Sequence, residues 1–165
     1  MQEIHAVHEF EPVVDKNTKI LILGTFPSVK SREASFYYGH PQNRFWKLLA
    51  RLLQCSMPET IEEKKEMLLS HGVGIWDVIA SCDITGSSDS SIKNVVPADM
   101  KGLFEKYKIK AVYANGKLAE KLYRKYSLPE TGVDIIGLPS TSPANAAYSL
   151  DRLAECWKQI LEFIN

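Results

Sequence analysis

The chain contains few cysteines, and none of them is spaced for a metal site. Cys55, Cys82 and Cys156 are the only three in 165 residues, and thiols this far apart cannot hold a metal cluster by themselves. No apolar run reaches the length of a membrane span, and no signal peptide opens the chain. We therefore expect a cytoplasmic protein with reduced cysteines, no metal, no cofactor and no membrane partner.

The chain has no excess of positive or negative charge. The 20 basic and 20 acidic side chains give a formal net charge of zero, which argues against a nucleic-acid partner. Their distribution offsets that argument, because residues 28–51 contain five basic side chains and one acidic, and residues 101–125 contain eight basic and two acidic. A neutral chain can thus present a basic face to phosphates. Solvated helix surfaces are the alternative explanation of both segments.

Strand and helix patterns alternate along a chain of ordinary globular composition, with 45% hydrophobic and 24% charged residues. Strands are predicted at residues 19–23, 72–79, 109–113 and 133–138, and helices at 43–53, 59–69, 97–107, 117–126 and 149–164. Residues 81–94 are polar and rich in glycine and serine, which predicts a loop. The alternation predicts an α/β fold, a three-layer α/β/α sandwich with a four-stranded parallel sheet. We expect one domain, residues 1–165, and a monomer.

The first predicted strand is apolar throughout, which is typical of a strand buried on both faces. It ends in a glycine–proline turn at residues 24–28, and a dense cluster of aromatic, amide and histidine side chains follows at residues 36–46. Ligands of parallel sheets bind just beyond the carboxyl ends of the strands, so both segments are expected at a binding site. Flat rings beside hydrogen-bonding groups suit a heterocyclic ligand such as a nucleobase.

The last predicted strand ends in a run of hydroxyl side chains between two prolines, at residues 139–145. Hydroxyls and backbone amides in such a run can bind anions, including DNA phosphates. A turn or a helix N-cap is the alternative interpretation of the serines and the threonine.

Three segments together resemble one protein family. They are the turn Gly24-Thr25-Phe26-Pro27-Ser28, the block Gly39-His40-Pro41-Gln42-Asn43-Arg44-Phe45-Trp46 and the loop Ser140-Thr141-Ser142-Pro143-Ala144-Asn145. They resemble the uracil-DNA glycosylase superfamily, and most of all its hypoxanthine-DNA (deoxyinosine) glycosylase branch. The resemblance implies an α/β/α sandwich that hydrolyses a base–sugar bond in DNA without a metal.

Two positions depart from the better-known members of that superfamily. Phe26 stands where they have an Asp or Asn that handles the attacking water, and Ser140 stands where a His or Asn meets the base. The hypoxanthine branch shares both losses and depends on the asparagine of the His-Pro-Gln-Asn block, here Asn43. The resemblance therefore implies that Asn43 is catalytic and that the chain is not a conventional, efficient uracil glycosylase.

The resemblance and the reaction together suggest roles for the other side chains. His40 is a second catalytic candidate, as an acid or a water holder, with a turn residue before a proline as the alternative. Phe36 or Tyr37 is expected to stack on an extruded base, with core packing as the alternative. The base-binding set is completed by Gly24, Thr25, Phe26 and Ser140, and the expected DNA contacts are Ser28, Arg44, Ser142, Pro143, Ala144 and Asn145.

These roles predict a monofunctional DNA glycosylase that acts on deaminated bases in DNA, with hypoxanthine favoured over uracil. No lysine lies inside the three segments, so the sequence offers no amine there for a Schiff base with the sugar. Two alternatives stay open. One is a uracil or mismatch glycosylase of the same fold, and the other is a catalytically inert nucleic-acid or nucleobase-binding protein that keeps the pocket.

Overall fold

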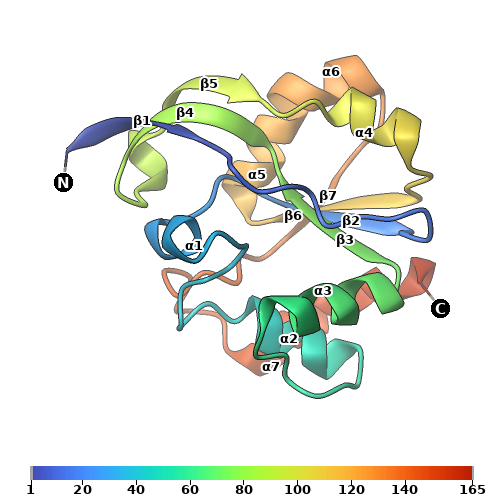
Figure 1. The fold of residues 1–165 in the computed structure, drawn as a ribbon. Helices are drawn as coiled ribbons and strands as arrows, with labels where there is room; N and C mark the ends of the chain where they lie inside the picture. Colours follow the sequence, from blue (N-terminus) through green and yellow to red (C-terminus); the bar gives the residue numbers. More distant parts are fainter. Residues whose placement is uncertain (1, 165) are drawn as a thin grey trace.

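A four-stranded parallel sheet runs through the middle of the molecule (Figure 1). The computed structural model describes residues 2–164. The strands are ordered β3-β2-β6-β7, with bounds Val73–Asp77, Ile20–Gly24, Ala111–Asn115 and Ile136–Leu138. All three neighbouring pairs are parallel. The carboxyl ends of all four strands therefore meet at one edge of the sheet.

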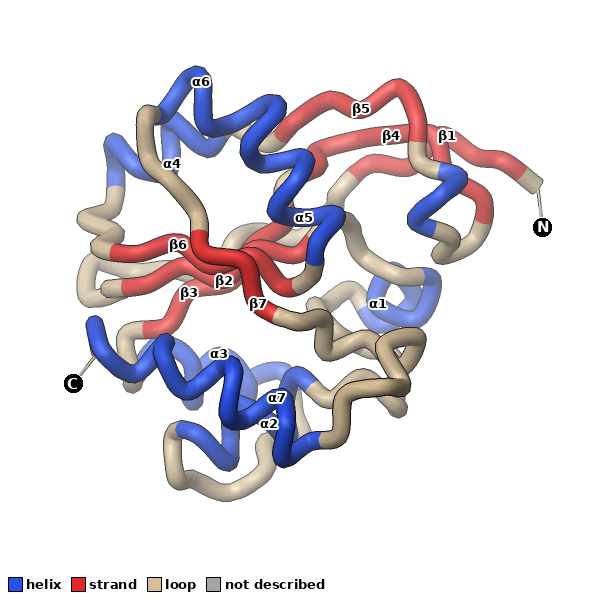
Figure 2. The backbone as a smooth tube through the Cα atoms, turned by 180° about the vertical axis from the view of Figure 1, so that it is seen from behind, coloured by secondary structure: helices blue, strands red, loops and turns tan. Residues whose placement is uncertain are grey.

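Helices cover both faces of this sheet (Figure 2). One face packs against α2, α3 and α7, which span Phe45–Leu52, Ile61–Ser70 and Leu150–Trp157. The other packs against α4, α5 and α6, which span Met100–Lys106, Lys117–Leu122 and Leu128–Thr131. Along β2, Ile20 and Ile22 enter the first core, while Leu21 and Leu23 enter the second, as the two-residue period of a strand requires. The predicted α/β/α sandwich with a four-stranded parallel sheet is confirmed.

A second sheet of three antiparallel strands was not predicted. It is ordered β1-β4-β5, with bounds Glu3–Val7, Ile79–Thr85 and Lys93–Pro97. The loop predicted at residues 81–94 is therefore wrong, and so is a helix starting at Pro97, which pairs with Ile79 in the sheet. The helix begins at Met100 instead, after Asp99 caps it by accepting from the Gly102 amide. Pairing with distant strands overrides the weak strand preference of serine, aspartate and glycine.

Several shorter elements connect these layers. Helix α1 (Val29–Ala34) follows β2, and 3₁₀ turns span Asp89–Ser91 and Lys158–Phe163. Helix α5 continues through one π-helical turn, Tyr123–Ser127, into α6. The predicted helix at 117–126 is thus longer and less regular than its periodicity suggested.

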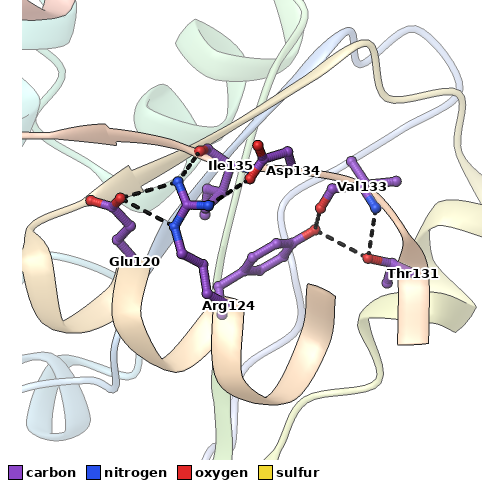
Figure 3. A network of polar contacts seen from close by, with 7 residues as sticks. Glu120, Arg124, Thr131, Val133, Asp134 and Ile135 are labelled. Atoms are coloured by element: carbon purple, nitrogen blue, oxygen red, sulfur yellow. Dashed lines mark hydrogen bonds and ion pairs between the residues drawn. The ribbon is translucent and has the colours of Figure 1, made fainter. Parts of the chain in front are cut away.

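A polar network anchors this long helical segment to the chain that leads into β7 (Figure 3). The Arg124 guanidinium donates to the carboxylates of Glu120 and Asp134 and to the carbonyl of Ile135. The hydroxyl of Tyr123 donates to the Val133 carbonyl at 2.6 Å. These bonds fix the entry into β7, and so the position of the loop that follows it.

Within residues 2–164, no helix combines the length and the apolar character needed to cross a bilayer. The same residues contain no group of three or more His, Cys, Asp or Glu side chains arranged to hold a metal ion.

Candidate active site

A cavity of about 480 Å³ opens at the carboxyl edge of the parallel sheet, within the size range of small-molecule sites. Its walls come from the turn after β2 and the start of α1, from residues 37–43, from the ends of β3 and β6, from residues 84–92 of the second sheet and its connection, and from the loop after β7. Segments far apart in the sequence meet here because all four strands point toward this edge. The cavity therefore lies where the sequence predicted a site.

Most of the predicted site residues line this cavity. They are Gly24, Thr25, Phe26, Ser28, Tyr37, His40, Asn43, Ser140, Ser142, Pro143 and Ala144. Phe36, Arg44 and Asn145 are not among the lining residues. The three segments that carry the family resemblance thus converge on one site, although not every residue in them faces it.

The side chain of Asn43 is held by two hydrogen-bond partners, one of which is itself bonded to Asn115. Its Oδ1 accepts from the backbone amide of Phe45 at 2.9 Å and from the Thr141 hydroxyl at 2.8 Å. Thr141 is fully buried, and its hydroxyl accepts from Asn115 Nδ2 at 3.0 Å. The Asn115 Oδ1 in turn accepts from the Thr141 amide at 2.9 Å. This chain of hydrogen bonds links the ends of β6 and β7 to Asn43.

This arrangement fixes which end of the Asn43 amide is free. A backbone N–H can only donate, so the atom that faces Phe45 must be the oxygen. The Nδ2 group has no hydrogen-bond partner in the part of the chain that the structure describes. Asn43 therefore presents a preorganised N–H donor at the cavity, which suits a site where negative charge develops. Sequence reasoning did not find Thr141 and Asn115, because neither reaches Asn43 except through the fold.

Arg44 has a role that the sequence did not suggest. Its guanidinium donates to three backbone carbonyls of the loop after β7, those of Ser142, Asn145 and Tyr148. Its backbone amide also donates to the Thr141 carbonyl at 3.1 Å. Arg44 thus fixes the shape of the loop, so that consecutive residues, Asn43 and Arg44, organise the cavity and the loop beside it.

The serines of the two flanking segments satisfy backbone groups. Ser28 is the N-cap of α1, where its side chain accepts from the Ser31 amide. The hydroxyls of Ser140 and Ser142 accept from the amides of Ser142 and Ala144. The turn and cap interpretation of these residues is confirmed, and their contact with DNA stays a prediction.

His40 lies in the turn before Asn43 and also lines the cavity. Its Nδ1 accepts from the Gln42 amide at 3.1 Å, and its backbone carbonyl accepts from the Asn43 amide. The neutral ring therefore carries its proton on Nε2. His40 shapes the turn that places Asn43, and its chemical role stays a prediction.

The aromatic cluster is mostly core. Phe36 is 4% exposed and stacks on Trp46 with ring centroids 5.9 Å apart, so its expected place against an extruded base is wrong. Tyr37 is 2% exposed, and its hydroxyl donates to the Glu11 carbonyl at 2.8 Å. Burial raises the pKa of Tyr37 well above its ordinary value. Phe26 and Tyr38 are half-buried and line the cavity, so they are more accessible to a stacked base than Phe36 and Tyr37.

Two groups at the deep end of the cavity were also missed. Asp77, the last residue of β3, lines the cavity and pairs with His8, Nε2 to Oδ2, at 2.8 Å. Tyr38 lines the cavity as well, and its buried hydroxyl has no hydrogen-bond partner within residues 2–164. Burial, and then the Asp77 carboxylate, raise the pKa of Tyr38 well above its ordinary value. Its hydroxyl therefore stays protonated at physiological pH.

Comparison with known proteins agrees with this geometry. The model of the uracil DNA glycosylase superfamily matches residues 11–161. The chain belongs to this superfamily. A hypoxanthine DNA glycosylase of Methanosarcina acetivorans is 36% identical over 153 residues, which cover 92% of this chain and 95% of that protein. A hypoxanthine DNA glycosylase of Methanosarcina barkeri is 38% identical over 86 residues, which cover 52% and 54%.

The fold is shared with a superfamily structure as well. The solution NMR structure of a candidate uracil DNA glycosylase from Methanosarcina acetivorans superposes with a TM-score of 0.80 at 34% identity. The match covers 94% of this chain and 96% of the other. The predicted membership in the superfamily, in the branch named for hypoxanthine, is confirmed.

Proposed function

We propose that this protein is a monofunctional DNA glycosylase that removes deaminated bases, with hypoxanthine as its preferred base and uracil as a second, in base excision repair. Membership in the superfamily and the two hypoxanthine DNA glycosylases among its relatives support the proposal. The observation that carries it is the Asn43 amide, whose oxygen is fully engaged and whose N–H donor is left for a ligand in the cavity.

The reaction breaks the bond between the base nitrogen and C1′ of the sugar. The bonding electron pair leaves with the base, C1′ becomes oxocarbenium-like, and the oxygen of a water molecule bonds to C1′ while the water loses a proton, which passes through solvent to the departing base and leaves it neutral. Asn43 Nδ2–H donates to the departing base as its negative charge develops, which is where a fixed donor lowers the barrier most. Phe26 can accept no proton, so stabilising the leaving base must provide much of the catalysis.

The cavity has to receive a base that has left the duplex. An enzyme that acts on the bond of a single base extrudes the nucleotide into a pocket, and Phe26 provides an apolar surface for the base. The loop after β7, fixed by Arg44, lies next to that pocket. We expect residues 143–145 of this loop to enter the minor groove and occupy the gap left in the stack.

The absence of a lysine from the cavity lining supports hydrolysis by water alone. None of the described residues that line the cavity is a lysine, so they offer no amine to attack C1′ and form a Schiff base. The expected product is an abasic site in an intact strand.

The test is a single-turnover assay on matched duplexes that contain one deoxyinosine, deoxyuridine or deoxyxanthosine, with an undamaged duplex as control. Half of each sample is treated with alkali to cleave abasic sites. We expect cleavage only after alkali, fastest for deoxyinosine. Cleavage without alkali would contradict the monofunctional mechanism. Binding of the damaged duplex without base release would favour an inert nucleobase-binding protein instead.

A further inference from the structure

One member of a buried histidine–aspartate pair, Asp77, lines the cavity, whereas its partner His8 is not among the lining residues. The side chains of His8 and Asp77 are each 5% exposed, and His8 Nε2 lies 2.8 Å from Asp77 Oδ2. Asp77 ends β3, whereas His8 follows β1 and is held by its backbone amide, which donates to the Ala80 carbonyl at 2.8 Å. Two charged or polar groups buried together are costly unless each is well paired.

The other oxygen of Asp77 lies next to Gly24, a residue of the cavity lining. A Cβ atom placed on Gly24, which also lines the cavity, would lie only 2.5 Å from Asp77 Oδ1. The Oδ1 atom has no hydrogen-bond partner among residues 2–164. The buried Tyr38 hydroxyl lies 3.1 Å from the same Cβ position and is also unpartnered. Buried polar atoms are nearly always satisfied in folded proteins, so the unpartnered Tyr38 hydroxyl indicates a missing ligand, and Asp77 Oδ1 beside it is an acceptor that the same ligand could use.

The imidazole is held in place by rings on three sides. Its centroid lies 4.7 Å from Phe10, 5.7 Å from Tyr37 and 6.1 Å from Phe26. These rings restrict its rotation and keep Nε2 directed at Asp77. Phe26, which lines the cavity, therefore also packs against His8.

We propose that His8 is a positioning residue, which holds Asp77 so that Oδ1 accepts the ring N–H of the extruded base. The inference rests on the proposed function. A carboxylate only accepts hydrogen bonds. Deamination gives hypoxanthine an N1–H and uracil an N3–H, whereas adenine and cytosine have a lone pair at these ring positions. The pair therefore selects deaminated bases over their parents, since two facing acceptors repel and leave both groups unpaired.

The test compares two substitutions of His8 that have similar size. His8→Gln keeps a side-chain N–H donor for Asp77 Oδ2, and His8→Leu has none. We expect His8→Leu to slow single-turnover hypoxanthine release about 10- to 100-fold, the range of one hydrogen bond to a charged group, and His8→Gln to recover most of that loss. His5 on β1, which pairs with exposed Asp83 at 2.9 Å, supplies the control. His5→Leu removes a similar pair away from the cavity and should leave the rate unchanged.

A double-mutant cycle shows whether His8 acts through Asp77. In an Asp77→Asn background, His8→Leu should have little further effect on the rate, whereas two independent structural roles would give additive losses. Binding of free hypoxanthine and free adenine, measured by titration calorimetry, provides a readout that needs no catalysis. Asp77→Asn should reduce the preference of the protein for hypoxanthine over adenine, because the new amide can turn an N–H toward the base.

The outcomes separate this inference from the proposed function. If the unaltered protein releases hypoxanthine and a folded His8→Leu variant does so equally fast, His8 has no positioning role although the glycosylase proposal stands. If the unaltered protein releases no base, the proposed function fails. The preference for free hypoxanthine over free adenine then remains as the test of whether the His8–Asp77 pair selects the base. An unchanged preference in both variants would then refute it. Should His8→Leu not fold, the rate of His8→Gln and the preference of Asp77→Asn remain to decide it.

Discussion

The substitution Asn43→Asp separates a donor role of Asn43 from a structural role. The aspartate has nearly the same shape as the asparagine. One of its oxygens can still accept from the Phe45 amide and the Thr141 hydroxyl, which lie 2.9 and 2.8 Å from Asn43 Oδ1 in the structure. What changes is the other end, where an N–H donor becomes an oxygen with negative charge. The fold should therefore be kept while the electrostatics of the cavity are reversed.

The expected loss of rate has two parts. Removing a hydrogen bond to a charged group costs about 1.5 to 3 kcal/mol. Asn43→Asp places a second carboxylate, in addition to the one proposed for Asp77, about 4 Å from the developing base anion, and this second charge adds repulsion of up to about 4 kcal/mol at an effective dielectric constant of about 20. Together these raise the barrier by several kcal/mol, and about 1.4 kcal/mol is a factor of ten in rate. We expect Asn43→Asp to slow hypoxanthine release by about 10³-fold or more.

Asn43→Ala is the matched comparison. It removes the donor without adding charge, so the rate should fall by roughly 10²-fold or more, within the range for lost electrostatic groups, but less than for Asn43→Asp. It also removes the acceptor for Phe45 and Thr141, which should lower the free energy of unfolding by about 1 kcal/mol or more. We therefore expect Asn43→Ala to be the faster variant and Asn43→Asp to be the more stable one.

Single-turnover assays on a deoxyinosine duplex measure the rate of hypoxanthine release, and urea denaturation measures the free energy of unfolding. If Asn43→Asp were faster than Asn43→Ala, the residue would act on the attacking water as an acceptor and not on the leaving base as a donor. If both variants kept the rate of the unaltered protein, Asn43 would have no part in the chemistry.

Three further predictions concern the cavity wall, the loop and the buried tyrosines. Phe26→Asn should retain the fold at a packing cost of up to a few kcal/mol and raise uracil release relative to hypoxanthine release in matched single-turnover assays; an unchanged ratio in a folded variant would place Phe26 outside the reaction. Arg44→Lys replaces a planar guanidinium, whose Nη1 and Nη2 groups reach separate carbonyls, with one compact ammonium, so it should weaken binding to damaged and undamaged duplexes alike and speed proteolysis within residues 142–148, whereas unaltered binding would mean that the loop needs no anchor. The pKa values of Tyr37 and Tyr38 are raised in the folded state. Their contribution to the free energy of unfolding is therefore fully present below the unfolded pKa of about 10, and above it is lost by up to about 1.4 kcal/mol per pH unit for each tyrosine. The urea midpoint should fall between pH 9 and 11, and it should fall less steeply in Tyr38→Phe. An equal slope of midpoint against pH in the two proteins would contradict the raised pKa of Tyr38.

The parallel sheet was predictable because its strands are buried on both faces. The β2 strand is fully buried from Ile20 to Gly24, so its residues are apolar without alternation, and the glycine and proline that follow mark its end. The β1-β4-β5 sheet has no such signal. Strand β4 alternates between buried and half-buried positions with serine and aspartate among them, and its pairing with β1 joins residues that lie 78 positions apart, as between His5 and Asp83.

The sequence predicted which segments form the site, but it did not predict what individual side chains in them contact. Asn43 was identified from a resemblance, yet the reason why its N–H faces a ligand is the buried chain through Thr141 and Asn115, and that chain exists only after folding. Arg44 was expected at DNA because arginines bind phosphates. Its three carbonyl partners lie about 100 residues away in sequence, which no local pattern can reveal.

The same limit applies to the missing polar residue at position 26. A sequence motif reports the chemistry of one strand end, but a cavity at the edge of a parallel sheet draws on all strand ends together. Gly24 on β2 pairs in register with Asp77 on β3, and the missing side chain of the one makes room for the carboxylate of the other. A phenylalanine at position 26, a glycine at 24 and an aspartate at 77 are therefore parts of one arrangement, in which the ring of Phe26 packs against His8 and His8 pairs with the Asp77 carboxylate.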